Sequence, residues 1–178
     1  ETLAEVEAEL WGQLAPRAGD PTHPWPTPVL ATNNAEMADA RLVVIREVDA
    51  RQKQLLFYTD ERAGKVAQLL HHPHGTMVMW CPKLAWQLRC RVRLAMEMSG
   101  LAASSRWARI RLSPAAQDYL SPLPPGTNLP AVPAHPPVAR DYFAVIDATI
   151  EAIDWLELHP DGHRRAIFDD HGARWVQP

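Results

Sequence analysis

Two arginines bracket a run of four aliphatic residues in the segment Arg41-Leu42-Val43-Val44-Ile45-Arg46. The β-branched residues favour a strand, in which successive side chains point to opposite faces. The two arginines are an odd number of positions apart, so regular alternation would separate them unless a β-bulge intervenes. The planar guanidinium group matches phosphate oxygens, which makes this segment a candidate phosphate site. The alternative is a strand with two solvated charges near its ends.

A second cationic group lies in residues 57–65, which run from a predicted strand into a predicted helix. Arg62 and Lys65 are three positions apart and are therefore neighbours on one helical face. The first turn of a helix attracts anions through its free N–H groups and its dipole. Together with Arg41, these cations could neutralise a phosphate dianion. The alternative is a helix capped by Asp60 that carries two solvated cations.

Three further side chains have the shape and polarity to contact a planar, hydrogen-bonding ring. Gln87 begins the polar face of the longest predicted strand, and its amide offers both a donor and an acceptor. Trp155 could pack against such a ring, and a turn at residues 159–162 would bring Arg165 beside it as a cation. The simpler alternatives are a surface glutamine, a core tryptophan and an exposed arginine.

The pattern of apolar residues predicts many short strands and few helices. Residues 86–98 alternate apolar and polar side chains, which is typical of a strand with one face in a core. We expect further strands at 27–32, 40–48, 53–59, 76–81, 142–158, 163–169 and 174–176. Helices are expected at 2–15, 60–70 and 101–119, the last with a break at Ser113-Pro114. We therefore predict a mainly β protein, a β-barrel with flanking helices, with one domain over residues 1–178, an N-terminal helix within 1–20 and a proline-rich loop at 121–140.

The composition argues against several function classes. A net charge of −3 over 178 residues offers no basic surface for nucleic acid. No apolar stretch approaches the ~20 residues that span a bilayer, and the acidic first residues do not resemble a signal peptide, so we expect a cytoplasmic protein without a membrane partner. Cys81 and Cys90 lie within apolar runs and are expected to be buried thiols. The group His71, His72 and His74 lacks the spacing of a metal site, and no metal is expected.

In their order and spacing, these segments resemble the pyridoxamine 5'-phosphate oxidase family, and most closely its oxidase-related FMN-binding branch. The resemblance covers about residues 24–178. It implies a six-stranded antiparallel Greek-key split barrel that forms a homodimer, with FMN in the two clefts at the subunit interface. It also implies a small-molecule substrate.

The resemblance further implies a role for each matched residue. The FMN phosphate would be held by Arg41, Arg62 and Lys65. The flavin and its ribityl-phosphate chain would contact Tyr58 and Thr59. The isoalloxazine would face the backbone of Leu42, Val43 and Val44. Arg46 takes the place of a lysine that faces the flavin and the substrate. The opposite subunit would contribute Gln87, Trp155 and Arg165.

On the substrate side the resemblance is weaker. Tyr119 and His163 keep residue types with which the family's oxidase binds its substrate, and Arg46 is a third candidate substrate contact. Two arginines of the oxidase fall on Leu123 and Asp161, and a carboxylate would repel a substrate phosphate. We therefore expect an FMN-dependent oxidoreductase with a different small substrate. A genuine pyridoxamine or pyridoxine 5'-phosphate oxidase is one alternative, and a flavin- or haem-binding module without turnover is another.

Overall fold

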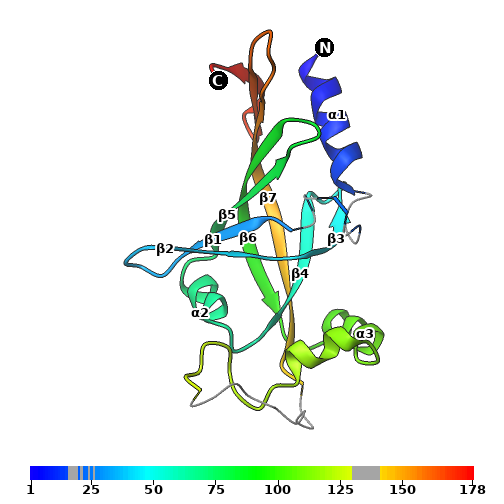
Figure 1. Cartoon of the computed structure of the whole chain (residues 1–178), viewed down its shortest axis with the longest axis vertical. Coiled ribbons are helices and arrows are strands. Elements are labelled where there is room, and N and C mark those ends of the chain that lie inside the picture. Colours follow the sequence, from blue (N-terminus) through cyan, green and yellow to red (C-terminus); the bar gives the residue numbers. More distant parts are fainter. Residues whose placement is uncertain (16–19, 21, 24, 26, 130–140) are drawn as a thin grey trace.

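The computed structural model describes residues 1–15, 20, 22, 23, 25, 27–129 and 141–178. Within these residues, nine antiparallel strands form one sheet that short helices flank (Figure 1). The strands are β1 (Val29–Asn33), β2 (Ala38–Leu42), β3 (Ile45–Asp49), β4 (Gln54–Asp60), β5 (His74–Cys81), β6 (Trp86–Glu97), β7 (Phe143–Glu157), β8 (Arg164–Asp169) and β9 (Gly172–Val176). The helices are α1 (Leu3–Leu14), α2 (Gly64–His71), α3 (Leu101–Ile110) and the 3-10 helix η2 (Pro114–Tyr119).

The sheet is built around its longest strands. The strand order is β2-β1-β5-β6-β7-β4-β3, and β8 pairs with β7 and β9. Alternate side chains of β6, from Trp86 to Leu94, are buried, as the period-two pattern predicted. Cys81 and Cys90 are buried free thiols, also as predicted, and burial raises the pKa of Cys90 to about 12. The predicted β-barrel with flanking helices is confirmed.

The prediction of one strand at 40–48 is wrong, because the structure has two strands there. β2 ends at Leu42 and β3 begins at Ile45, and these strands lie at opposite ends of the sheet order. The chain crosses between them at Val43, which is buried and whose N–H donates to the Pro28 carbonyl at 3.0 Å. The buried Val43 lies between the two strands, so the aliphatic run that was predicted as one strand is divided into β2 and β3.

The β-bulge that the odd arginine spacing suggested lies at Arg46. In the pairing of β3 with β4, Ile45 lies opposite Phe57 and Glu47 lies opposite Leu56, so Arg46 has no cross-strand partner. A bulge of this kind changes the direction of a side chain without ending the strand. Because Arg41 lies in β2 and Arg46 in β3, the spacing of the two arginines does not by itself predict this bulge.

α1, α3 and η2 lie towards the two ends of the molecule, whereas α2 lies beside the sheet (Figure 1). α1 and the hairpin of β8 and β9 are at one end of the long axis, and α3 and η2 are at the other (Figure 1). The predicted break between α3 and η2 is confirmed at Ser113. The prediction that Asp60 caps α2 is wrong, because Ala63 is the N-cap and has no side-chain cap bond. None of the helices in the described ranges is long and apolar enough to span a membrane.

Candidate cofactor site

Arg41 is the centre of a hydrogen-bond network where β1, β2 and α2 meet. One terminal nitrogen donates to the Leu30 carbonyl (3.3 Å) and to the buried Thr32 hydroxyl. The other donates to Gln68 of α2 (3.2 Å) and forms an ion pair with Asp39. The side chain is only 21% exposed. The guanidinium group is therefore fixed against α2, and the alternative of a freely solvated strand-end charge is wrong.

Lys65, in the first turn of α2, lies close enough to Arg41 for the two charges to interact. Its ammonium group donates to the Thr59 hydroxyl at the end of β4 (2.8 Å). Burial lowers the pKa of Lys65, and the charge of Arg41 lowers it further, while Asp60 and Asp39 offset this only in part. Lys65 has no carboxylate at ion-pairing distance in the part of the chain that the structure describes. Arg41 and Lys65 are called the cation pair below. Asp39 compensates the charge of Arg41 in part, so Lys65 contributes most to binding an anion beside the helix N-terminus.

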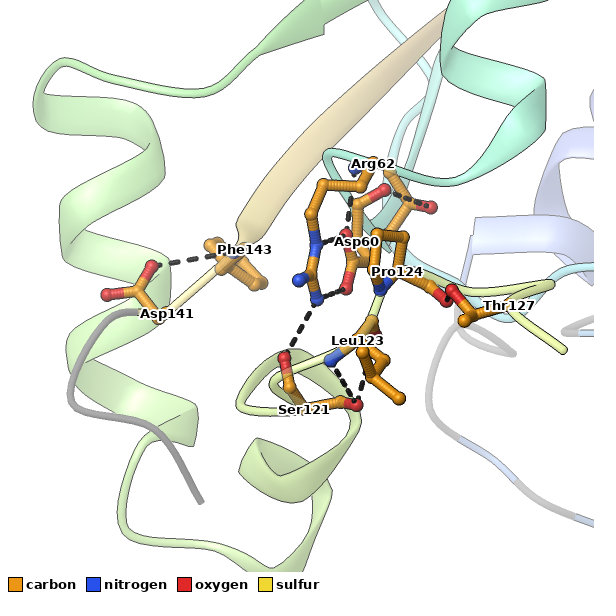
Figure 2. A network of polar contacts seen from close by, with 9 residues as sticks. Asp60, Arg62, Ser121, Leu123, Pro124, Thr127, Asp141 and Phe143 are labelled. Carbon is orange, nitrogen blue, oxygen red and sulfur yellow. Dashed lines mark hydrogen bonds and ion pairs between the residues drawn. The ribbon is translucent and has the colours of Figure 1, made fainter. Parts of the chain in front are cut away.

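Arg62, the third predicted phosphate ligand, is engaged elsewhere (Figure 2). Its Nε and Nη2 donate to the two carboxylate oxygens of Asp60 at 3.0 and 2.7 Å. Nη2 also donates to the Ser121 carbonyl at 3.0 Å, and the guanidinium group lies 3.3 Å from the ring centroid of Tyr142. In this conformation Arg62 does not join the cation pair, because its guanidinium group already binds both carboxylate oxygens of Asp60.

Arg46, Tyr58 and Tyr119 form a second group beyond the crossing from β2 to β3. The Arg46 guanidinium group lies 5.7 Å from the ring centroid of Tyr58, whose hydroxyl donates to Glu47 at 3.4 Å. Burial raises the pKa of Tyr119, and the charge of Arg46 opposes this rise. The structure therefore brings together Arg46 and Tyr119, two of the three predicted substrate residues. Among the residues described, Arg46 has no carboxylate partner.

The crossing itself connects these two groups. Its residues are Leu42, Val43 and Val44, which the family resemblance places against the isoalloxazine. Leu42 is 65% exposed and Val44 is 42% exposed. Both flank the buried Val43, so this short segment presents backbone and apolar surface between the cation pair and Arg46. Its contact with a flavin stays a prediction.

The pairing of β6, β7 and β8 determines which residues reach the outer face of the sheet. Gln87 lies opposite Leu156, and Leu156 lies opposite Arg165, so all three point to the same outer face. Trp155 precedes Leu156 and therefore points inward, where it has no exposed surface. Its ring lies 5.3 Å from that of Trp86 in an edge-on contact. The structure thus places Trp155 in the barrel core and does not support its predicted contact with a flavin of the partner subunit.

Arg165 and His163 are the other predicted residues near the end of the chain. Arg165 forms two hydrogen bonds to Asp154, at 2.9 and 2.8 Å, which compensate its charge. His163 is exposed in the turn between β7 and β8, and its Nδ1 accepts a hydrogen bond from the His159 N–H at 3.1 Å. This turn lies at the end of the molecule opposite η2, which ends at Tyr119 (Figure 1). One chain alone therefore does not bring His163 to Tyr119.

Three polar residues of the Arg41 network were absent from the sequence prediction. They are Thr32, Asp39 and Gln68. Gln68 could have been found, because it lies one helical turn after Lys65 on the same face of α2. Thr32 and Asp39 are cross-strand partners in the hairpin of β1 and β2, and that register becomes visible only in the folded structure.

No group of three or more histidine, cysteine, aspartate or glutamate residues that could hold a metal ion was found among the described residues. The candidate site is built from Arg41, Lys65 and the first turn of α2, beside the exposed apolar segment at Leu42 and Val44, and its cations suit an anion.

The sequence and the fold were compared with known proteins. Residues 11–96 match the family model described as pyridoxamine 5'-phosphate oxidase, FMN-binding domain. This range contains the cation pair, the crossing and Gln87. A comparison with curated proteins gave no match.

Several solved structures have the same fold. A pyridoxamine 5'-phosphate oxidase-related, FMN-binding protein from Nostoc punctiforme PCC 73102 superimposes with a TM-score of 0.74 at 21% identity over 96% of each chain. PhzG from Burkholderia lata 383, in complex with tetrahydrophenazine-1-carboxylic acid, gives a TM-score of 0.72 at 13% identity, over 99% of this chain and 92% of that one. A protein from Clostridium acetobutylicum related to general stress protein 26 gives 0.58 at 10% identity, over 94% and 96%. The resemblance seen in the sequence is confirmed: the chain has the split-barrel fold of the pyridoxamine 5'-phosphate oxidase-like FMN-binding proteins, and residues 11–96 match that family's FMN-binding domain.

Proposed function

We propose that the chain is an FMN-dependent oxidoreductase that acts as a homodimer on a small substrate without a phosphate group. The observation that carries the proposal is the cation pair beside the first turn of α2. A phosphate dianion between Arg41 and Lys65 would compensate the charge that lowers the pKa of Lys65. It would also accept hydrogen bonds from the first N–H groups of α2. The residues present therefore fit the phosphate of FMN.

FMN, when bound, supplies the electron transfer, and the chain supplies binding and orientation. With the phosphate at the cation pair, the apolar crossing at Leu42 and Val44 is the nearest surface that the same segment offers to a flavin ring. Arg46 follows this crossing and offers an uncompensated cation to an anionic group of a substrate. Tyr58 and Tyr119 lie beside Arg46 at the same position.

The substrate is proposed to lack a phosphate because two matched positions no longer carry a cation. They are Leu123 and Asp161, both exposed. A phosphate would meet an apolar side chain at the first and a negative charge at the second. PhzG, which has the same fold, was crystallised with tetrahydrophenazine-1-carboxylic acid, a ring compound that carries a carboxylate and no phosphate. Arg46 could bind a carboxylate of this kind.

An exposed apolar surface on the sheet supports the homodimer. Val29, Leu42 and Trp80 are 37%, 65% and 43% exposed. Leu42 lies opposite Val29, and Val29 lies opposite Val78 of β5. Trp80, two positions after Val78, lies opposite Gln87. These apolar side chains therefore share the outer face with Gln87. Contiguous exposed apolar residues mark interaction surfaces. In a dimer formed through this face, Gln87 would approach the site of the other subunit.

A charge in this surface is expected to prevent dimerisation. Trp80→Glu should elute as a monomer in size-exclusion chromatography with light scattering, because the interface would have to bury an unpaired carboxylate. FMN affinity should fall as well, since each site would lose the residues of its partner. Lys83→Glu, an exposed charge change in the turn after β5, is the control and should stay dimeric. A Trp80→Glu dimer as stable as the wild type would place the interface elsewhere.

The cofactor is tested by an absorption spectrum of the protein after FMN supplementation and desalting. We expect a bound flavin band in the wild type and its loss in Arg41→Ala. Riboflavin, which has no phosphate, is the matched ligand and should bind far more weakly than FMN. No flavin band in the wild type would exclude the proposed cofactor, and equal retention of riboflavin would exclude the cation pair as its phosphate site.

Catalysis is tested separately, on the FMN-loaded protein. Steady-state turnover with a reduced nicotinamide would support an oxidoreductase, and binding without turnover across donors and acceptors would favour a flavin-binding module. Oxidation of pyridoxamine 5'-phosphate at a rate typical of enzymes, roughly 1–10³ per second, would contradict a phosphate-free substrate.

A further inference from the structure

Arg62 connects three segments that lie far apart in the sequence. It binds both carboxylate oxygens of Asp60, at the end of β4, and the carbonyl of Ser121, after η2. Its guanidinium group stacks on the ring of Tyr142, just before β7, at 3.3 Å from the ring centroid. Figure 2 shows Arg62 between Asp60 and the segment that contains Ser121, Leu123 and Pro124. We call Asp60, Arg62, Ser121 and Tyr142 the Arg62 latch.

Backbone hydrogen bonds around the latch hold the same segments together. The Glu61 N–H donates to the Tyr142 carbonyl at 2.8 Å, and the Tyr142 N–H donates to the Tyr119 carbonyl at 2.9 Å. Tyr142 is thus bonded on one side to the chain that enters α2 and on the other to the end of η2. Within the segment, Ser121 and Leu123 are hydrogen-bonded to each other, and Thr127 is hydrogen-bonded to Pro124.

The charges of the latch are balanced within the latch itself. The Asp60 side chain is 5% exposed and that of Arg62 is 17% exposed, so the pair is largely withdrawn from water. A two-point arginine–carboxylate contact of this kind has fixed geometry, and breaking it would leave a charge buried without a partner. To bind a phosphate, Arg62 would have to break its contact with Asp60. Lys65 has no such contact to break, because no carboxylate pairs with it in the part of the chain described here.

We infer that Arg62 is a positioning residue and not a phosphate ligand: it fixes residues 121–129 against the end of β4, beside the cofactor site. Thr59, whose hydroxyl binds Lys65, directly precedes Asp60, so the latch and the cation pair share one strand end. Only the link to a cofactor rests on the proposed function, because the latch itself is defined by contacts within the chain.

The fixed segment forms one wall of a cavity of about 210 Å³. Its lining includes Asp60, Ser121, Leu123, Pro124, Thr127 and Leu129. None of its lining residues is a cation. The charge of Asp60 is compensated by Arg62, whereas Asp118 adds a second carboxylate to the lining. By fixing this wall, the latch disfavours a phosphate at this position, because the phosphate would meet carboxylates and no cation, in agreement with Leu123 in place of an arginine.

The test compares Arg62→Lys, Arg62→Ala and Tyr142→Leu with the wild type in two measurements. The first is amide hydrogen exchange at Glu61, Leu123, Thr127 and Tyr142 in the protein without cofactor. The second is FMN affinity and its dependence on salt. Arg51→Lys, an exposed arginine in the turn between β3 and β4, is the matched control. Tyr142→Leu removes the stacking and keeps the Asp60 pair, so it still reports if Arg62→Ala fails to fold.

We expect exchange at these amides to be about tenfold faster than in the wild type, or more, in all three latch variants, and to be unchanged in the control. Arg62→Lys should not rescue the wild-type behaviour, because an ammonium group can neither bind both carboxylate oxygens with the same geometry nor stack as a plane. FMN affinity in Arg62→Lys and Tyr142→Leu should stay within about threefold of the wild type, with the same salt dependence.

Two results would overturn the inference. One is unchanged exchange at the amides of Glu61, Leu123, Thr127 and Tyr142 in Arg62→Lys and Tyr142→Leu. The other is a loss of FMN affinity of about tenfold or more in Arg62→Ala that Arg62→Lys restores, which would make Arg62 a phosphate-binding charge. Failure of the wild type to bind FMN would count against the proposed function alone, since the exchange measurements are made without the cofactor.

Discussion

Replacing Lys65 with methionine is expected to weaken FMN binding by about 10- to 100-fold and, at the same time, to stabilise the protein without cofactor. Loss of a charge-assisted hydrogen bond to a phosphate costs about 1.5–3 kcal/mol, which gives the loss of affinity. The gain in stability follows from the half-buried ammonium group, which the folded chain holds near Arg41 at a lowered pKa. Methionine keeps the length of the side chain and removes that charge. Fluorescence titration of FMN and thermal unfolding measure the two effects.

The pH dependence of both effects has a fixed sign. The pKa of Lys65 is lowered in the folded chain relative to 10.5, so the folded chain loses this proton at a lower pH than the unfolded chain. The protein without FMN should therefore gain stability from this group as the pH rises from the folded-state pKa towards 10.5. FMN affinity should fall over the same interval, because the phosphate binds the protonated form. Lys65→Met should lose both dependences.

A control separates the cation pair from general charge effects. Lys83→Met removes an exposed lysine from the turn between β5 and β6 and should leave FMN affinity and stability unchanged. In Lys65→Met, the melting temperature without cofactor should rise by about 2 °C if roughly 1 kcal/mol is gained. Wild-type FMN affinity in Lys65→Met would show that the phosphate binds elsewhere.

Trp155→Ala is expected to destabilise the fold by about 3–5 kcal/mol, a drop in melting temperature of roughly 6–20 °C. Trp155 has no exposed surface and contacts the rings of Trp86 and Trp175, at centroid distances of 5.3 and 6.3 Å. Its indole nitrogen is buried and has no hydrogen-bond partner in the described residues, so the loss concerns apolar packing. Urea unfolding followed by circular dichroism measures the change.

Trp155→Phe distinguishes a core residue from a flavin contact. Phenylalanine keeps most of the packing, so this variant should fold with a smaller loss of stability and keep FMN affinity within about threefold of the wild type. Loss of FMN binding in a well-folded Trp155→Phe protein would show that the side chain contacts the cofactor after all. Leu156→Ala, on the outer face, is the matched variant for residues that a partner subunit could reach.

The sequence by itself determined the type and order of most elements, except the two strands in the predicted range 40–48, and the chemical character of the site. Alternation along residues 86–98 defined β6, because a strand with one buried face must repeat every two residues. Proline at position 114 defined the break after α3. Arginine and lysine at positions 41 and 65 indicated an anion, since both residue types are cationic.

Only the tertiary structure decided which of these cations share a site. Arg41 and Lys65 meet because the hairpin of β1 and β2 lies against α2, a long-range contact that local patterns do not encode. Arg62 is held by Asp60 and Tyr142, and its choice of partner depends on where the start of β7 lies. Trp155 points inward because the register of β7 with β6 and β8 sets its face, and a shift of one residue would reverse it. Residue types fix charge and shape, whereas register and long-range packing fix distance, and a binding site depends on distance.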